Sequence, residues 1–218
     1  MDLPGSGESE TPRGPYSTVA YADQLSGFLG AICIERAHVA GVSLGAAVAT
    51  HLAARHPERV RSLSLHSAWD RTDAYLRAIV EMWRALADAL PTIADVVIAG
   101  IFPLCFTPEM YVQRPAIAQA LAEFVHGRPA QPSQAFYWQT EAVLAHDATL
   151  ALGEIQAPTL VTFGAHDLVT STRFAEPLTR GIANSELVVF DHLSHGALHE
   201  DPDAFNRATL AFLERQRV

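Results

Sequence analysis

The sequence predicts an α/β fold, with a mostly parallel β-sheet that carries helices on both faces and a helical insertion. Two observations support this class. Four short runs of apolar, often β-branched residues alternate with segments of helical periodicity, which is the pattern of parallel strands joined by crossover helices. From residue 70 to about residue 147 the pattern changes to helical segments. We therefore expect two core segments, residues 1–69 and 148–218, on either side of a helical cap at residues 70–147.

The first strand is expected at residues 37–42, a short apolar run of the kind that is buried in parallel sheets. Residues 46–55 are rich in alanine and favour a helix, which His56-Pro57 should end. A strand and a helix are thus separated by only a few residues, so the chain must turn sharply between them.

That turn contains Gly41-Val42-Ser43-Leu44-Gly45, a G-x-S-x-G motif. At a strand-to-helix turn, this motif holds a nucleophilic serine in a strained conformation with its hydroxyl exposed. We expect Gly41 and Gly45 to be glycines because a side chain at either place would collide with neighbouring backbone. The Leu44 amide opens the helix and points to where an oxyanion would form. The alternative is an ordinary turn with a glycine-flanked serine.

The remaining elements follow the same patterns. Turn residues separate the helical segments of the insertion, in which residues 93–105 form a short apolar stretch. Further strands are expected at residues 59–67, 157–164 and 186–190, and further helices at residues 75–90, 110–125, 134–144, 171–181 and 202–215.

Ser43, Asp167 and His195 each follow an expected strand, and the carboxyl ends of parallel strands gather at one edge of a sheet. A serine hydroxyl needs a base to take its proton, and the base needs an acid to fix its tautomer. The three residues can fill these roles as nucleophile, base (His195) and acid (Asp167). Two alternatives stay open: Asp167 as a cap of the helix near Ser171, and His195 as a structural loop residue.

A metal site is the other interpretation of the histidine-rich segment. His192, His195, His199 and Glu200 have spacings that place ligands on one face of a helix. Gly196 interrupts that helix, however, and no second group of ligands stands out elsewhere. We therefore expect that the protein needs neither a metal nor an organic cofactor.

All three tryptophans, Trp69, Trp83 and Trp138, lie at the edge of the insertion or inside it. They predict either a plain helical core or a lid whose inner face shapes an apolar substrate pocket.

Composition excludes several classes of partner. The formal net charge is −9 and no cluster of Lys and Arg occurs, which argues against nucleic acid and anionic membranes. No apolar run is long enough to span a bilayer. Cys33 and Cys105 are too few for a disulfide scaffold, and we expect both to be buried in a reduced, cytoplasmic protein.

Together these motifs resemble the α/β-hydrolase family with a helical cap. Residues 2–9 resemble the family's D-x-x-G-x-G-x-S turn, and residues 164–167 and 194–195 resemble its acid and histidine segments. The resemblance covers essentially the whole chain and implies Ser43 as nucleophile, Asp167 as acid and His195 as base. A serine in place of aspartate disfavours the haloalkane dehalogenase and epoxide hydrolase branches. Similar proteins include carboxylesterases, enol-lactonases, carbon-carbon bond hydrolases and cofactor-free haloperoxidases.

One feature departs from the family pattern. In the family the D-x-x-G-x-G-x-S turn follows the fourth strand, whereas here it begins at residue 2. We therefore expect a core without the first strands and without the loop that supplies a second oxyanion amide. Losing one such donor typically lowers turnover by about 100 to 1000-fold. The strand ending at Val42 would become a sheet edge, through which two copies would associate. A coding fragment, pairing with another chain, or loss of catalysis would each explain the departure.

The residues thus favour a serine hydrolase that cleaves a small carboxylic ester or lactone through an acyl-enzyme on Ser43. One alternative is a catalytically impaired or non-catalytic small-molecule binding protein with the same fold. Acyl transfer to an acceptor other than water is another. The identity of the substrate depends on how the insertion folds over the serine.

Overall fold

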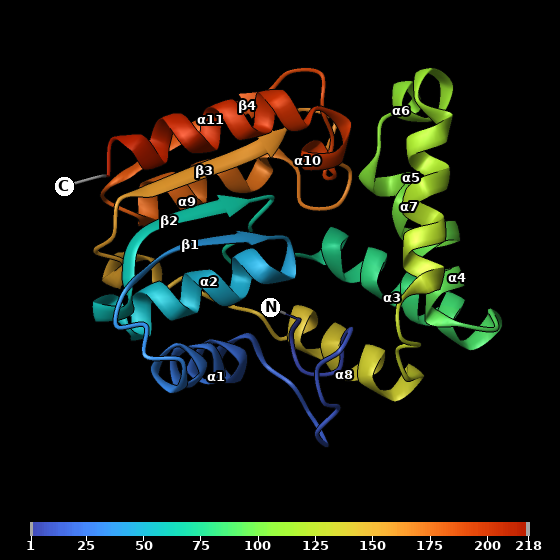
Figure 1. Ribbon diagram of the computed structural model, residues 1–218, viewed down its shortest axis with the longest axis horizontal. Helices are drawn as coiled ribbons and strands as arrows, with labels where there is room; N and C mark the ends of the chain where they lie inside the picture. The colour runs from blue at the N-terminus through green and yellow to red at the C-terminus, as the bar shows by residue number, and fades with distance from the viewer. Residues whose placement is uncertain (1, 217–218) are drawn as a thin grey trace.

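Four parallel strands form the single sheet of the computed structural model, which describes residues 2–216. The strand order is β1 (Ala37–Val42), β2 (Val60–His66), β3 (Thr159–Gly164) and β4 (Ser185–Phe190) (Figure 1). Gly41 pairs with Leu65, and Leu65 pairs with Val161, so the carboxyl ends of the strands lie at one edge. The predicted α/β class is confirmed, and every predicted strand lies within two residues of its observed bounds.

Helices cover both faces of the sheet. On one face, Leu52, Leu63 and Phe163 are fully buried in a continuous apolar core. On the other face, the ring of Phe205 lies 5.2 Å from that of His66 and 6.2 Å from that of Phe190, between ring centres. The helices of these two core segments are α1 (Thr18–Ala31), α2 (Leu44–Arg55), α9 (Ala175–Gly181), α10 (Ala197–Glu200) and α11 (Pro202–Glu214).

Helix α1 has no counterpart among the predicted elements. Ser17 caps it by accepting a hydrogen bond from the Ala20 amide at 3.0 Å. Helix α1 packs against α2, and its buried side chains include Tyr21, whose hydroxyl donates to the Pro4 carbonyl at 3.0 Å. Gly27 and Gly30 lower its helix propensity, which explains why the sequence pattern did not reveal it.

Six α-helices, one π-helical turn and a short 3-10 turn (Leu152–Glu154) lie between β2 and β3. Figure 1 shows α3 to α7 beyond the carboxyl ends of the strands. The ends of this insertion meet: the Thr72 amide donates to the His146 carbonyl at 3.1 Å, and Ala148 donates to Asp70 at 2.7 Å. The inserted elements are α3 (Ala74–Ala89), α4 (Ile93–Val96), the π-helical turn (Val97–Ile101), α5 (Phe102–Cys105), α6 (Pro108–Gln113), α7 (Pro115–Gly127) and α8 (Ser133–Leu144).

The single helix expected at residues 110–125 is two helices in the structure. Helix α6 ends before Arg114, and α7 begins at Pro115. A proline has no amide hydrogen, and its ring disfavours the helical conformation of the preceding residue, so Pro115 opens a new helix instead of continuing the old one. Across residues 2–216, no helix combines the length and apolar character needed to cross a membrane.

Strand β1 lies at the edge of the sheet. Among the described residues it pairs only with β2. Its side chains alternate between half-buried and exposed, and Val42 is 38% exposed. The sheet edge that the sequence predicted at Val42 is therefore present.

The two cysteines differ in burial. Cys105 is buried as expected, but Cys33 is exposed, so that prediction was wrong for Cys33. Cys33 follows the end of α1 with φ 58°, and its amide donates to the Gly30 carbonyl. The chain reverses direction at this turn on the surface, which leaves the thiol outside the core.

Candidate functional site

Ser43 occupies the strained turn that the motif predicted. Its φ of 52° lies in the left-handed region, which is uncommon for a residue with a side chain. The Ser43 amide donates to the His66 carbonyl at 3.0 Å, while its carbonyl accepts from the Ala46 and Ala47 amides. These bonds fix the backbone, so the half-buried side chain projects from a rigid turn between β1 and α2.

The two glycines of the motif differ in their surroundings. A Cβ atom on Gly41 would lie 2.6 Å from the Ala46 amide nitrogen and closer still to the Gly45 carbonyl oxygen. A Cβ on Gly45 would meet nothing within 4 Å. The steric role predicted for Gly41 is thus confirmed, whereas the one predicted for Gly45 is wrong, because the helix turns its Cα toward open space.

Asp167 and His195 form a buried hydrogen-bonded pair. His195 Nδ1 lies 2.9 Å from Asp167 Oδ2, and the two side chains are 8% and 0% exposed. The other carboxylate oxygen accepts from the Val169 and Thr170 amides at 2.7 and 3.0 Å. Burial opposes ionisation of Asp167, but its electrostatic attraction to the His195 ring and the hydrogen bond from that ring outweigh this effect and hold the pKa of the carboxyl well below its ordinary value.

Thr170 also contacts this pair and was not identified from the sequence. Its hydroxyl oxygen lies 3.0 Å from both Asp167 Oδ2 and the Ser67 carbonyl, and its single proton can be donated to one of them at a time. The local signal was Asp-x-x-Thr, in which an aspartate accepts from amides two and three residues ahead. The helical turn that follows is capped by Ser171, so Asp167 is not its cap.

His66 connects the serine turn to the histidine loop. Its backbone carbonyl holds the Ser43 amide, and its ring Nε2 lies 3.1 Å from the His195 carbonyl. Because a carbonyl only accepts, Nε2 carries the proton and Nδ1 accepts from the Thr162 hydroxyl at 2.8 Å. Burial lowers the pKa of His66 to about 4, so the ring is neutral at pH 7.

The Ser43 hydroxyl makes no hydrogen bond with any residue in the range 2–216. Its place at the carboxyl end of β1 and the bridge through His66 put it at the same edge of the sheet as His195. Leu44 is the first residue of α2, so its amide lies at the positive end of the helix dipole.

The four residues considered as metal ligands have other partners. His192 is exposed and lies 3.4 Å from Asp201, while the ring of His199 lies 6.3 Å from that of Phe106. Both carboxylate oxygens of Glu200 accept hydrogen bonds from protein groups. Within the part of the chain that the structure describes, no three His, Cys, Asp or Glu residues are grouped to hold a metal ion.

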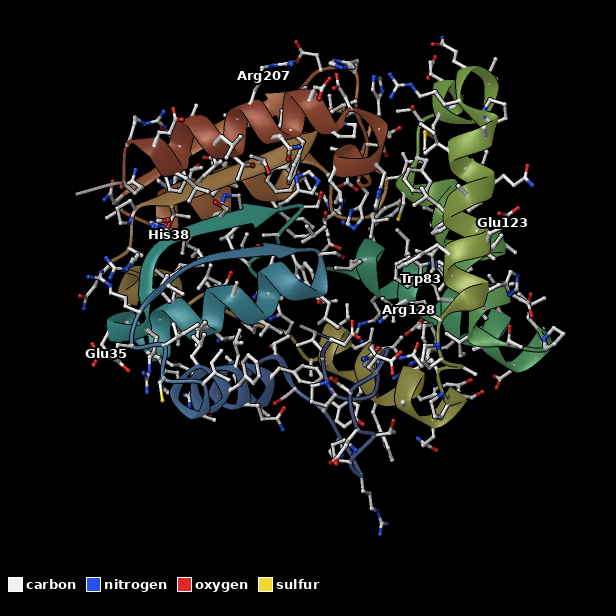
Figure 2. All side chains as sticks on the ribbon, viewed as in Figure 1. Glu35, His38, Trp83, Glu123, Arg128 and Arg207 are labelled. Carbon is white, nitrogen blue, oxygen red and sulfur yellow. The ribbon has the colours of Figure 1, made fainter. Side chains whose placement is uncertain are left out.

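The tryptophans occupy three different environments. Trp69 is buried in the core, where its indole N–H donates to the Thr72 hydroxyl at 3.0 Å. Trp83 lies among the inserted helices (Figure 2) and donates to the Gly100 carbonyl at 3.2 Å. Trp138 packs edge-on against Tyr16, with ring centres 5.4 Å apart. Their role in a substrate pocket stays a prediction.

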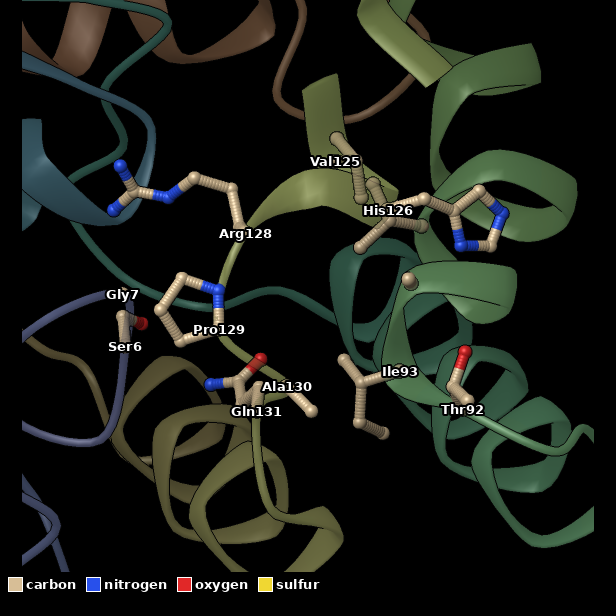
Figure 3. A pocket seen from close by; sticks show the side chains of 12 residues that line it. Ser6, Gly7, Thr92, Ile93, Val125, His126, Arg128, Pro129, Ala130 and Gln131 are labelled. Atoms are coloured by element: carbon tan, nitrogen blue, oxygen red, sulfur yellow. The ribbon is translucent and has the colours of Figure 1, made fainter. Parts of the chain in front are cut away.

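Three cavities border the inserted helices, and one of them, of about 270 Å³, lies between Met110, Arg114 and His192. Another, of about 550 Å³, lies between Phe106, Tyr111 and the loop that carries Asp167. The third, of about 230 Å³, separates the N-terminal turn from the insertion, between Ile93 and Arg128 (Figure 3). Of these three cavities, the one of about 550 Å³ borders the Asp167–His195 pair, because Asp167 is among its lining residues.

Comparisons with known proteins agree with the fold. Residues 1–99 match a family model described as "alpha/beta hydrolase fold". A protein of Azorhizobium caulinodans named "Putative carbamate hydrolase RutD" is 30% identical over 97% of this chain and 78% of its own length. A pimeloyl-[acyl-carrier protein] methyl ester esterase of Neisseria meningitidis is also 30% identical, over 98% of this chain and 81% of its own length.

A solved structure adds a third similarity. The enol-lactonase of Burkholderia xenovorans LB400 superposes with a TM-score of 0.81 at 28% identity, covering 98% of this chain and 79% of that one. The relatives named here are an esterase, a lactonase and an assigned carbamate hydrolase, and all are hydrolases.

Proposed function

Because the chain belongs to the α/β-hydrolase family, we propose that it is a serine hydrolase that cleaves a small carboxylic ester or lactone through an acyl-enzyme on Ser43. The buried hydrogen bond between Asp167 and His195 is the observation that carries this proposal. Two backbone amides fix the buried, ionised carboxylate of Asp167. In this position it can hold the imidazole of His195 in one tautomer.

The reaction proceeds in two halves. His195 Nε2 takes the Ser43 proton as the serine oxygen attacks the substrate carbonyl, and the Leu44 amide donates to the resulting oxyanion. When the tetrahedral intermediate collapses, the C–O bond to the alcohol breaks and His195 returns the proton to that alcohol. Water, deprotonated by His195, then attacks the acyl-enzyme and releases the acid and free Ser43. Throughout, Asp167 holds Nδ1–H and stabilises the imidazolium.

The inserted helices serve as a cap over this site, with Trp83 and Trp138 contributing apolar surface to the substrate pocket. The position of α3 to α7 beyond the carboxyl ends of the strands supports this role (Figure 1). The relatives' substrates support the ester and lactone class, since two of them are named as a methyl ester esterase and an enol-lactonase. Two cysteines without a disulfide support a reducing, cytoplasmic location.

The test is Ser43→Ala, assayed with p-nitrophenyl esters of short acids and with a fluorophosphonate probe that labels activated serines. We expect the wild type to show a burst of acylation and covalent labelling, and Ser43→Ala to lose both. Undiminished turnover in Ser43→Ala would refute the assignment. If the wild type gives no labelling but a ligand raises its melting temperature, the protein is a non-catalytic binder of the same fold.

Asp167→Asn tests the acid. The side-chain oxygen of the asparagine would still accept the hydrogen bonds from the Val169 and Thr170 amides. The NH₂ group of the asparagine would then face His195 Nδ1. This arrangement favours the tautomer protonated at Nε2, which cannot accept the serine proton. We expect kcat to fall by about 10⁴-fold with little change in fold, as for the same exchange in other serine hydrolases. A loss smaller than tenfold would show that Asp167 does not have this role.

A further inference from the structure

Glu200 is a buried carboxylate that joins the inserted helices to the histidine loop. It lies on α10 and is only 6% exposed. One carboxylate oxygen accepts from the Thr107 amide at 2.7 Å and the Thr107 hydroxyl at 2.6 Å. The other accepts from the Ser194 amide at 2.6 Å. Thr107 belongs to the insertion and Ser194 directly precedes His195, so this one side chain spans the two segments.

The residue after His195 is held by the same segment. The Gly196 amide donates to the Cys105 carbonyl at 2.7 Å, and the Arg114 guanidinium donates to the Glu200 carbonyl. Both neighbours of His195 are therefore tied to residues 105–107 of the insertion, one through the Glu200 side chain and one directly.

The core holds the His195 ring through Asp167 and its carbonyl through the His66 ring. It also holds the neighbours of His195, since the Ser194 hydroxyl donates to the His166 carbonyl at 3.0 Å and the Gly196 carbonyl accepts from the His199 amide at 2.8 Å. The amides of Ser194 and Gly196, by contrast, donate to Glu200 and to Cys105 of the insertion. A general base must be held within about 0.5 Å of its working position, and that precision comes from the groups behind it. Hydrogen bonds to a buried carboxylate are among the stronger ones, and removing their acceptor leaves buried donors without a partner.

We propose that the inserted helices position the base His195 through Glu200, a positioning residue that links Thr107 to the Ser194 amide. The insertion is then part of the machinery that aligns His195, in addition to covering the site. Glu200 touches no reacting atom and acts through the backbone on either side of His195. This inference rests on the proposed serine hydrolase function.

Glu200→Gln is the sharpest test, because it keeps the shape of the side chain and replaces one acceptor oxygen by NH₂. Whichever way the glutamine amide is turned, its NH₂ group faces the backbone N–H of Thr107 or of Ser194. Two donors cannot form a hydrogen bond with each other, so one of the two links breaks. We expect the second-order rate of fluorophosphonate labelling and kcat to fall at least tenfold, with KM changed less than twofold. Glu81→Gln removes an exposed carboxylate from α3 and should change neither quantity.

Thr107→Val tests the same link from the insertion and guards against poor folding of the Glu200 variant. Valine keeps the backbone amide but loses the hydroxyl donor, so we expect kcat to fall about threefold. Rates are measured per folded molecule, well below the melting temperature of each variant. A merely structural Glu200 would lower the melting temperature but leave kcat per folded molecule unchanged, and that result would overturn the inference.

The two proposals fail in distinguishable ways. If wild-type protein is not labelled, or if Ser43→Ala is labelled equally, the proposed function is wrong. If wild type is labelled, Ser43→Ala is not, and Glu200→Gln and Thr107→Val both react at the wild-type rate, then only the link through Glu200 is wrong. In the double variant, we expect no loss beyond that of Glu200→Gln, because both changes break one connection.

Discussion

Gly41→Ala should destabilise the protein at the turn that carries Ser43. The added methyl group would lie 2.6 Å from the Ala46 amide nitrogen and closer still to the Gly45 carbonyl oxygen. Both are backbone atoms of the first turn of α2, which itself holds Ser43 through the bonds from Ala46 and Ala47. The helix must shift to admit the methyl group, since no flexible side chain can yield.

The loss of stability in Gly41→Ala can be estimated from the backbone atoms that the new methyl group would meet. Inserting a methyl group into packed structure typically costs about 1–3 kcal/mol, and a backbone obstruction places Gly41→Ala near 3 kcal/mol. For a chain of 218 residues, each 1 kcal/mol lowers the melting temperature by about 2–4 °C. We therefore expect a decrease of about 6–12 °C. Because the shift displaces Ser43 and the Leu44 amide, ester hydrolysis should be lost even where the variant is folded.

Gly45→Ala is the matched control within the same motif. Its methyl group meets nothing within 4 Å, and alanine favours a helix over glycine by up to about 1 kcal/mol. We expect its melting temperature to equal or exceed that of the wild type, with full activity. Urea denaturation and thermal unfolding of both variants give the comparison. Equal stabilities for the two variants would refute the reasoning that Gly41, and not Gly45, is fixed by close backbone contact.

Three further outcomes are expected. Burial lowers the pKa of His66 and His146 to about 4, below the ordinary value of about 6.5 in the unfolded chain. Their contribution to stability is complete above about pH 6.5 and is lost as the pH falls toward 4, by about 1.4 kcal/mol per pH unit for each ring. Urea denaturation at pH 7 and pH 5 should show this loss, and His146→Gln should reduce it; an unchanged loss would contradict the assignment. One thiol, Cys33, should react with a thiol reagent in the folded protein, and Cys105 only in denaturant, because it is buried and burial raises its pKa; two fast thiols would contradict this. The unpaired edge of β1 should associate with a second copy, and light scattering from a clean monomer at micromolar concentration would exclude that association.

The sequence was sufficient for features that depend on neighbours along the chain. The alternation of apolar runs with helical segments predicted the four strands, and the Ser43 motif predicted a strained turn. Predictions from the sequence failed where the local pattern was weak or was compatible with more than one structure. Helix α1 lacks a clear pattern, the glycine at position 45 needed no steric explanation, and the apparent helix over residues 110–125 contained Pro115.

The site shows the same division. Order along the chain was enough to nominate Ser43, Asp167 and His195, because each follows a strand and parallel strands end at one edge. The residues that hold these three side chains in place could not be predicted from the order along the chain. His66 is 129 residues from His195 in the sequence, and Thr107 is 93 residues from Glu200. A sequence shows which groups can donate or accept hydrogen bonds, but only folding decides which of them share the same buried space. For that reason Glu200 resembled a metal ligand in the sequence, whereas in the structure it joins the inserted helices to the loop of His195.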